Sequence, residues 1–98
     1  MSAYVVMIRR TVTDETEIAA YRAEAPLARE GHDVTPIVAY GALDVLEGAD
    51  LDGVAINRFP SMAAAREWYD SDRYRHAMAH RHRGADYQVI LVEGVDRP

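Results

Sequence analysis

The sequence contains no cysteine. This absence excludes a disulfide framework, a thiolate nucleophile and any metal site built on thiolates. The chain also lacks an excess of basic residues, since its formal net charge is -5 at pH 7. A protein that binds nucleic acid without sequence preference needs a basic surface to neutralise phosphates, so we expect no nucleic-acid partner.

Long hydrophobic runs are also missing, and no stretch approaches the length of a membrane span. Residues 1–10 place their positive charges after an apolar run, which is the reverse of a secretory signal. We therefore expect a cytoplasmic protein with no membrane partner. A nucleophile elbow, a phosphate-binding glycine loop and a dinucleotide-binding fingerprint are absent as well, and we expect no cofactor.

What is present fits one small folded domain over residues 1–98. The hydrophobic share of 49% is high enough for a packed core, which argues against disorder. A chain of this length still leaves much of its surface exposed, and a partner subunit would cover part of it.

The N-terminal half begins with a short, apolar and β-branched segment, residues 4–9, which predicts a strand. Asp14 and Glu17 then stand at capping-box spacing, so a helix should begin here and run to about Arg29. Pro26 should kink this helix, because its ring removes a hydrogen bond and crowds the preceding turn.

Two further strands are expected at residues 37–46 and 54–59, joined by a turn rich in glycine and aspartate. They form a hairpin in which Gly41 is a candidate bulge or a site of close packing.

The C-terminal half contains two serines in capping positions. Ser61 precedes a helix over residues 62–69, and Ser71 precedes a second segment that ends at Gly84. A last strand follows at residues 86–93. The resulting order β-α-β-β-α-β predicts an α+β, ferredoxin-like fold, with a four-stranded antiparallel sheet and two helices on one face.

The first and last strands are apolar on both faces. Residues 5–8 and 89–92 are unbroken apolar runs, whereas a sheet with one wet face should alternate apolar and polar residues. Two helices cover only one face. We therefore predict a homodimer in which the uncovered faces of two sheets pack together.

A group of residues in the second half resembles a family signature: Phe59-Pro60-Ser61, Ala65, Trp68-Tyr69, Ser71 and Tyr74. Residues 3–6, 45–48 and 91–95 add to the match, which is similar to the family named "domain of unknown function thirteen-thirty". The resemblance implies a dimeric α+β barrel, related in shape to small cofactor-independent monooxygenases and isomerases. It implies no reaction. Residues 32–41 lack the glycine-glycine-arginine type of turn usual in the family, so ligand contacts there cannot be transferred.

In this architecture a pocket is expected between the sheet and the helices. Trp68 and Tyr69 precede the break in the second helix, where they either fill the core or line the pocket. In the second case Trp68 contacts a substrate, and Tyr69 or Tyr74 donates a hydroxyl hydrogen bond to a bound carbonyl.

Arg81 shares a helical stripe with Tyr74, Ala77 and Met78, which is otherwise apolar. An arginine there should pair with a carboxylate, anchor an anionic ligand, or extend to solvent at the helix end. Arg58 and Arg9 are weaker candidates for the same binding role.

The histidines allow several interpretations. His76 and His80 are four residues apart, which is metal-ligand spacing, but neighbouring arginines oppose cation binding and we expect no metal. Both should face solvent. His82 and His32 are candidate proton-transfer groups near neutral pH. Since no histidine falls on the inward stripe, we expect no haem.

Two hypotheses follow. The first is a cofactor-independent enzyme, of monooxygenase or isomerase type, that acts on a small anionic or carbonyl-bearing molecule. The second is a non-catalytic dimeric module that binds a metabolite or stabilises an assembly. Whether Arg81, the two tyrosines and a histidine converge on one cavity distinguishes them.

Overall fold

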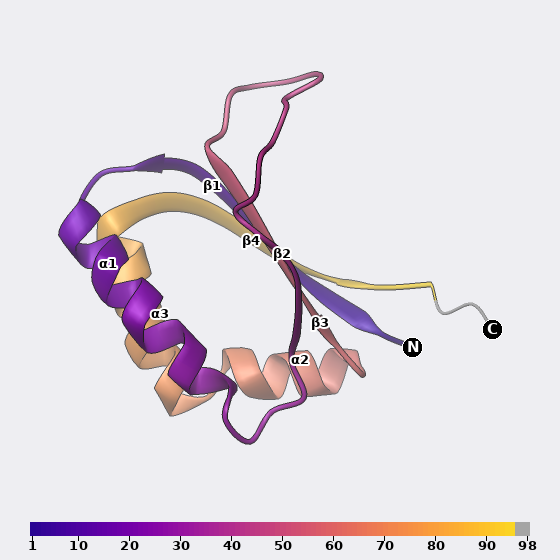
Figure 1. Cartoon of the computed structure of the whole chain (residues 1–98). Coiled ribbons are helices and arrows are strands. Elements are labelled where there is room, and N and C mark those ends of the chain that lie inside the picture. Colours follow the sequence, from indigo (N-terminus) through magenta and orange to yellow (C-terminus); the bar gives the residue numbers. More distant parts are fainter. Residues whose placement is uncertain (96–98) are drawn as a thin grey trace.

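The computed structural model describes residues 1–95, and it consists of a twisted sheet with helices on one face (Figure 1). A four-stranded sheet has the order β2-β3-β1-β4, and every neighbouring pair is antiparallel. The elements are β1 (Ala3–Val12), α1 (Glu15–Glu24), η1 (Ala25–Arg29), β2 (Thr35–Ala39), β3 (Gly53–Phe59), α2 (Met62–Tyr69), α3 (Asp72–Gly84) and β4 (Ala85–Glu93). This is the predicted ferredoxin-like α+β arrangement.

Side-chain caps set the beginnings of the α-helices as the sequence predicts. The Asp14 carboxylate accepts hydrogen bonds from the amides of Thr16 and Glu17. Ser61 and Ser71 each accept one from the amide three residues later, so they satisfy donors that lack an intrahelical partner.

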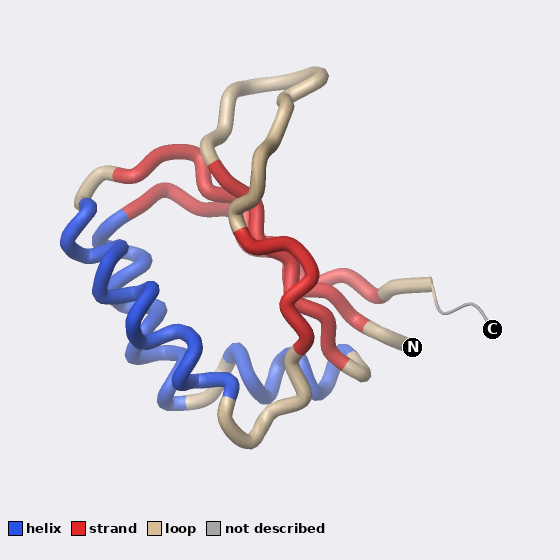
Figure 2. Tube along the Cα trace, viewed as in Figure 1, coloured by secondary structure: helices blue, strands red, loops and turns tan. Residues whose placement is uncertain are grey.

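The first helix and the second strand differ from expectation. The α-helix ends at Glu24, and Pro26 lies in the 3-10 turn η1, where its missing amide is tolerated. Strand β2 ends at Ala39 instead of residue 46, and residues 40–52 form the long loop that projects from the sheet (Figure 2). The bulge in β2 lies at Ile37, between the pairs of Pro36 and Val38, and nothing packs close to Gly41.

The break after Ala39 coincides with an unusual backbone conformation at Tyr40. Its φ is 56°, which is left-handed and uncommon for an aromatic residue. The amide of Tyr40 still bonds the Val54 carbonyl at 2.9 Å, so the chain leaves the sheet directly after this residue.

The two faces of the sheet differ in what covers them. The face toward the helices contains Val5, Met7, Ala55 and Phe59, which are buried against α-helical residues. On the other face, a row of four apolar side chains crosses all four strands, with Val38 beside Ile56, Ile56 beside Val6, and Val6 beside Ile90. In the part of the chain that the structure describes, no helix packs against this outer row (Figure 1).

Within the described residues, every helix is too short or too polar to span a bilayer.

Candidate functional site

Arg81 lies inside the protein, on the helical stripe that the sequence predicts. Tyr74 and Ala77 are fully buried, and Arg81 is only 2% exposed. The arginine therefore does not extend to solvent at the helix end, which removes one of its three expected roles.

The guanidinium of Arg81 has aromatic neighbours and no carboxylate partner. Its central carbon lies 5.1 Å from the centre of the Tyr87 ring and 5.9 Å from that of Tyr21. Among the described residues it forms no ion pair, and its buried Nε and Nη2 atoms have no hydrogen-bond partner. A ring face stabilises a desolvated cation by about 2 kcal/mol. A buried charge with unused donors costs more than that.

A hollow of about 330 Å³ opens beside this group at the β4 edge of the sheet. It brings together three of the residues that the sequence singles out, Tyr69, Arg81 and His82. Tyr74 is not part of its wall but lies behind it, with its ring centre 5.5 Å from that of Tyr69. The remaining wall comes from the start of β4: Ala85, Asp86, Tyr87 and Val89.

The protonation of the site is set by burial and by the arginine. Burial lowers the pKa of His82, and the positive charge of Arg81 lowers it further. Its imidazole is therefore neutral at pH 7 and able to accept a proton. Burial raises the pKa of Tyr74, although the nearby Arg81 opposes this, so the phenol keeps its proton.

Two pairs of hydrogen-bonded tyrosines lie near this hollow, and one of their members, Tyr87, forms part of its wall. The hydroxyls of Tyr21 and Tyr74 lie 2.8 Å apart, and those of Tyr40 and Tyr87 lie 2.7 Å apart. In each pair one hydroxyl donates to the other, and this satisfies the buried pair of Tyr21 and Tyr74 and the partly buried pair of Tyr40 and Tyr87. Burial, with the partner phenol adding to it, raises the pKa of both Tyr21 and Tyr40.

Sequence reasoning did not find Tyr40 and Tyr87. A signal existed for Tyr87, because it alternates with Val89 and Leu91 on one face of β4. No such signal existed for Tyr40, because the sequence predicts it inside a longer strand over residues 37–46.

Arg9 packs against the second of these pairs, at the ring of Tyr40. Its guanidinium carbon lies 4.6 Å from the centre of the Tyr40 ring, and its Nε donates to Asp52. Gly53 makes room for this stack, since a Cβ there would lie 2.7 Å from Tyr40 Cδ1. Arg9 therefore has a structural carboxylate partner, which Arg81 lacks.

The other two candidates lie elsewhere. Arg58 is on the outer side of β3, because Asn57 and Phe59 on either side of it are buried toward the helices. It lines a separate hollow with Asp33 and Thr35. Trp68 is 2% exposed, and its ring centre lies 4.0 Å from that of Tyr74 and 5.2 Å from that of Phe59.

His80 does not face solvent as expected. Its Nδ1 lies 3.0 Å from the carboxylate of Glu17, which also accepts a 3.0 Å hydrogen bond from Arg83. The ring centres of His76 and His80 are 5.7 Å apart. The described residues contain no cluster of three or more histidine, aspartate or glutamate side chains suited to a metal ion.

The fold is similar to several solved structures. A protein of unknown function from Rhodopseudomonas palustris has a TM-score of 0.76 at 20% identity, covering 98% of this chain and 84% of that one. A dimeric ferredoxin-like protein of unknown function from Bacteroides fragilis has a TM-score of 0.60 at 8% identity, covering 95% and 96%. SnoaB from Streptomyces nogalater, a cofactor-independent oxygenase, has a TM-score of 0.60 at 11% identity, covering 98% and 94%.

No curated protein sequence matches the chain significantly. A family model described as "Domain of unknown function (DUF1330)" matches residues 2–95. This is the family that the residues around Trp68 resemble, and the match spans nearly the whole sequence. The chain belongs to the DUF1330 family.

Proposed function

We propose that the hollow beside Arg81 binds a small organic anion, a carboxylate or the enolate of a carbonyl compound. The observation that carries this proposal is the buried guanidinium with two unused donors and no carboxylate partner. A planar oxyanion in the hollow compensates the charge of the arginine. Because Nε and Nη2 have almost no accessible surface, the guanidinium must shift toward the hollow before both can donate to the anion.

The neighbours of Arg81 favour a proton-transfer reaction on the bound molecule. Neutral His82 removes a proton from the carbon next to the carbonyl group, and the electron pair of that bond moves to the carbonyl oxygen. Arg81 stabilises the resulting enolate, with Tyr69 as an additional donor. Return of the proton from His82 to a different carbon completes an isomerisation, so atoms and electrons balance without a co-reactant.

A cofactor-independent reaction agrees with one further observation, since one neighbour of the same fold is a cofactor-independent oxygenase. The sequence contains no lysine, so no side-chain amine is available to form an imine with a carbonyl substrate, and this favours direct proton abstraction.

Thermal melts with benzoate, benzamide and acetoacetate test the binding step. We expect the two acids to raise the melting temperature of the wild type by mass action, and the amide to have little effect. Arg81→Met should abolish this response. Arg75→Met is the matched control, because Arg75 is exposed on the same helix and bonds the Asp70 carbonyl. Equal stabilisation by benzoate and benzamide, or a response retained in Arg81→Met, would contradict the proposal.

Deuterium exchange at the methylene carbon of acetoacetate tests the chemical step. Exchange above the buffer rate that is lost in His82→Gln supports the enzyme. Binding without any such exchange would leave the alternative, a non-catalytic metabolite-binding module.

We also propose that a second copy of the chain covers the outer face of the sheet. Val38, Ile90 and Val92 are 38%, 42% and 46% exposed there. Polar residues lie at the ends of this face, with Arg58 at one and the bonded Arg10 and Gln88 at the other. An apolar centre with a polar rim is typical of a protein interface, and two neighbours of this fold are dimeric.

A further inference from the structure

The hollow beside Arg81 continues along β4 into a second hollow. This second hollow has a volume of about 260 Å³ and lies between β4 and α2. Tyr69 and Val89 belong to the walls of both hollows, so the two meet at these side chains and form one groove that is open to the surface. The rest of the second wall is mainly apolar: Val5, Ala65, Arg66, Ile90 and Leu91.

The helix layer covers β1 but leaves the neighbouring strand β4 partly open. Across the two strands Val5 pairs with Leu91, and Met7 pairs in the same way with Val89. The two β1 side chains are each 2% exposed. Val89 and Leu91 face the same side of the sheet but are only half-buried. Apolar surface is therefore left uncovered inside the groove, and its burial by a ligand would be favourable.

The two ends of the groove differ in the charge that they offer. At one end lies the guanidinium of Arg81, which has no carboxylate partner among the described residues. The carboxylate of Asp86 in the same wall is exposed to solvent, which screens it. Arg66 lines the other end, but its guanidinium is already paired with Asp70 at 3.1 Å. An anion in the groove therefore has its charge at the Arg81 end.

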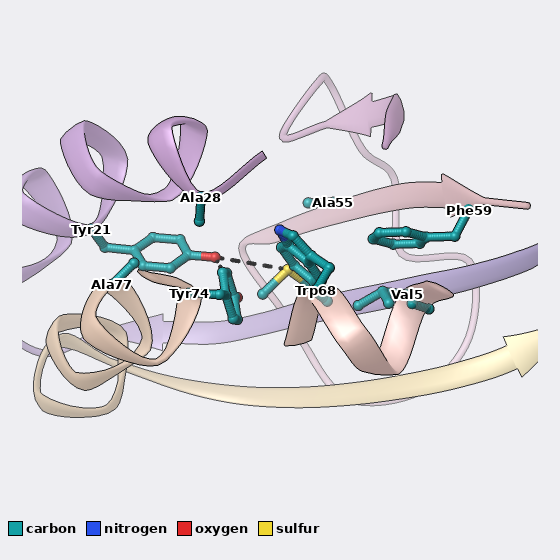
Figure 3. Close-up of a cluster of buried hydrophobic side chains, with 10 residues drawn as sticks. Val5, Tyr21, Ala28, Ala55, Phe59, Trp68, Tyr74 and Ala77 are labelled. Atoms are coloured by element: carbon teal, nitrogen blue, oxygen red, sulfur yellow. Dashed lines mark hydrogen bonds between the residues drawn. The ribbon is translucent and has the colours of Figure 1, made fainter. Parts of the chain in front are cut away.

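The core closes the inner side of the groove. Tyr74 lies behind the hollow of Arg81, and Val5 lines the second hollow. In Figure 3, Trp68 lies between these two side chains. Trp68 itself lines a different hollow, at the β2 edge of the sheet. A ligand thus extends from one hollow to the other along β4 and does not pass through the core.

We infer that the ligand of Arg81 is an elongated acid, with its carboxylate or β-keto acid head beside Arg81 and an aliphatic tail along β4 in the second hollow. The elongated ligand rests on the proposed function of Arg81 and narrows its substrate class. Tyr87 and Leu91 are four residues apart on β4, which corresponds to about 13 Å at about 3.3 Å per residue, so a chain of about eight to ten carbons extends into the second hollow.

Calorimetric titration with straight-chain acids from butyrate to dodecanoate tests this inference. Each methylene that enters the groove leaves water, so the affinity should rise about threefold per methylene up to decanoate. Dodecanoate should gain little more, because its end extends beyond the groove. Arg81→Met should weaken every acid of the series, since the head loses its cation.

Leu91→Asn tests the second hollow. It replaces an apolar wall residue with a polar one of similar size, so it should weaken decanoate about tenfold or more and remove most of the dependence on chain length. Leu46→Asn is the matched control, because Leu46 is 85% exposed on the loop that projects from the sheet. This control should bind the whole series as the wild type does.

A second measurement needs no variant. Nuclear Overhauser contacts should connect the terminal methyl group of decanoate with the methyl groups of Leu91 in the wild type. If Leu91 instead contacts a second copy of the chain in a mixture of labelled and unlabelled protein, that copy occupies the hollow and the inference is overturned.

The titrations also separate this inference from the proposed function. Equal affinities of butyrate and decanoate, both lost in Arg81→Met, would overturn the elongated ligand and leave the anion site standing. Decanoate binding that persists in Arg81→Met would mean that the groove holds an apolar chain without the arginine, which also overturns the inference. Failure of every acid to bind would overturn both.

Discussion

The guanidinium carbon of Arg81 lies 5.1 Å from the centre of the Tyr87 ring, where the last turns of α3 approach β4. Aromatic contact replaces the carboxylate that a buried arginine normally has. The rings of Tyr87 and Tyr21 hold this cation, and the anion that we propose for the hollow would compensate its charge.

Replacing Arg81 with methionine should not destabilise the ligand-free protein. Removal of the uncompensated buried charge outweighs the loss of the ring contacts, so we expect the free energy of unfolding to stay constant or rise by about 1–2 kcal/mol. Urea denaturation of Arg81→Met measures this change. A loss of about 3 kcal/mol or more would instead show that the arginine has a structural partner.

The same replacement should alter the titration of His82. Because burial and the charge of Arg81 both lower the pKa of this imidazole, Arg81→Met should raise its midpoint toward the usual value of 6.5. Proton NMR of the ring resonances follows the titration, and His82→Gln assigns the signal. An unchanged midpoint would mean that the two side chains do not interact.

Glu17 should make stability depend on acid pH. The hydrogen bond from His80 is the main cause that lowers its pKa below the usual 4.5, and Arg83 adds to it. The folded form therefore binds this proton less readily than the unfolded form. The contribution of ionised Glu17 to the stability of the fold is present above pH 4.5. It is lost as the pH falls through the lower pKa that Glu17 has in the folded state.

Melting curves of Glu17→Gln between pH 7 and pH 3 test this dependence. The difference in melting temperature between Glu17→Gln and the wild type should be largest at pH 7 and should shrink below pH 4.5. Glu67→Gln, which removes an exposed carboxylate from α2, is the control. If the difference in melting temperature grew as the pH falls, folding would raise the pKa of Glu17, which is the opposite of this prediction.

A charge on the outer face should prevent dimerisation. Ile90→Arg places a cation in the apolar row without disturbing the core, because Ile90 is already 42% exposed within one chain. Sedimentation at micromolar concentration should give a dimer for the wild type and a folded monomer of 11.0 kDa for Ile90→Arg. Gln88→Arg, at the polar end of the same strand, should remain dimeric. A wild type that sediments as a stable monomer would refute the proposed interface.

Gly53→Ala should disturb the stack of Tyr40 on Arg9. The added methyl group would lie 2.7 Å from Tyr40 Cδ1 and 3.0 Å from Arg9 Nη2, so at least one side chain must move. We expect a loss of about 1–3 kcal/mol in urea denaturation. Gly41→Ala is the matched control, because nothing lies within 4 Å of a Cβ there. Equal stabilities of the two variants would show that the stack contributes nothing.

Local signals in the sequence determined the order of the elements and the beginnings of the helices. A cap such as Asp14 or Ser61 acts on amides within three residues of itself, so its effect does not depend on the fold. The stripe of Tyr74, Ala77 and Arg81 is equally local, because helical periodicity alone places these residues on one face. The unbroken apolar runs likewise predicted a sheet that is apolar on both sides.

Tertiary structure alone decided where β2 ends and which residues meet. The pairing of β2 with β3 joins residues 16 to 23 positions apart, and the stack of Arg9 on Tyr40 joins residues 31 apart, so no local pattern encodes these contacts. That Arg81 meets aromatic rings and no carboxylate likewise depends on how α3, β4 and α1 pack together. For the same reason the sequence grouped Trp68 with Arg81, whereas the fold places them at hollows on opposite edges of one sheet.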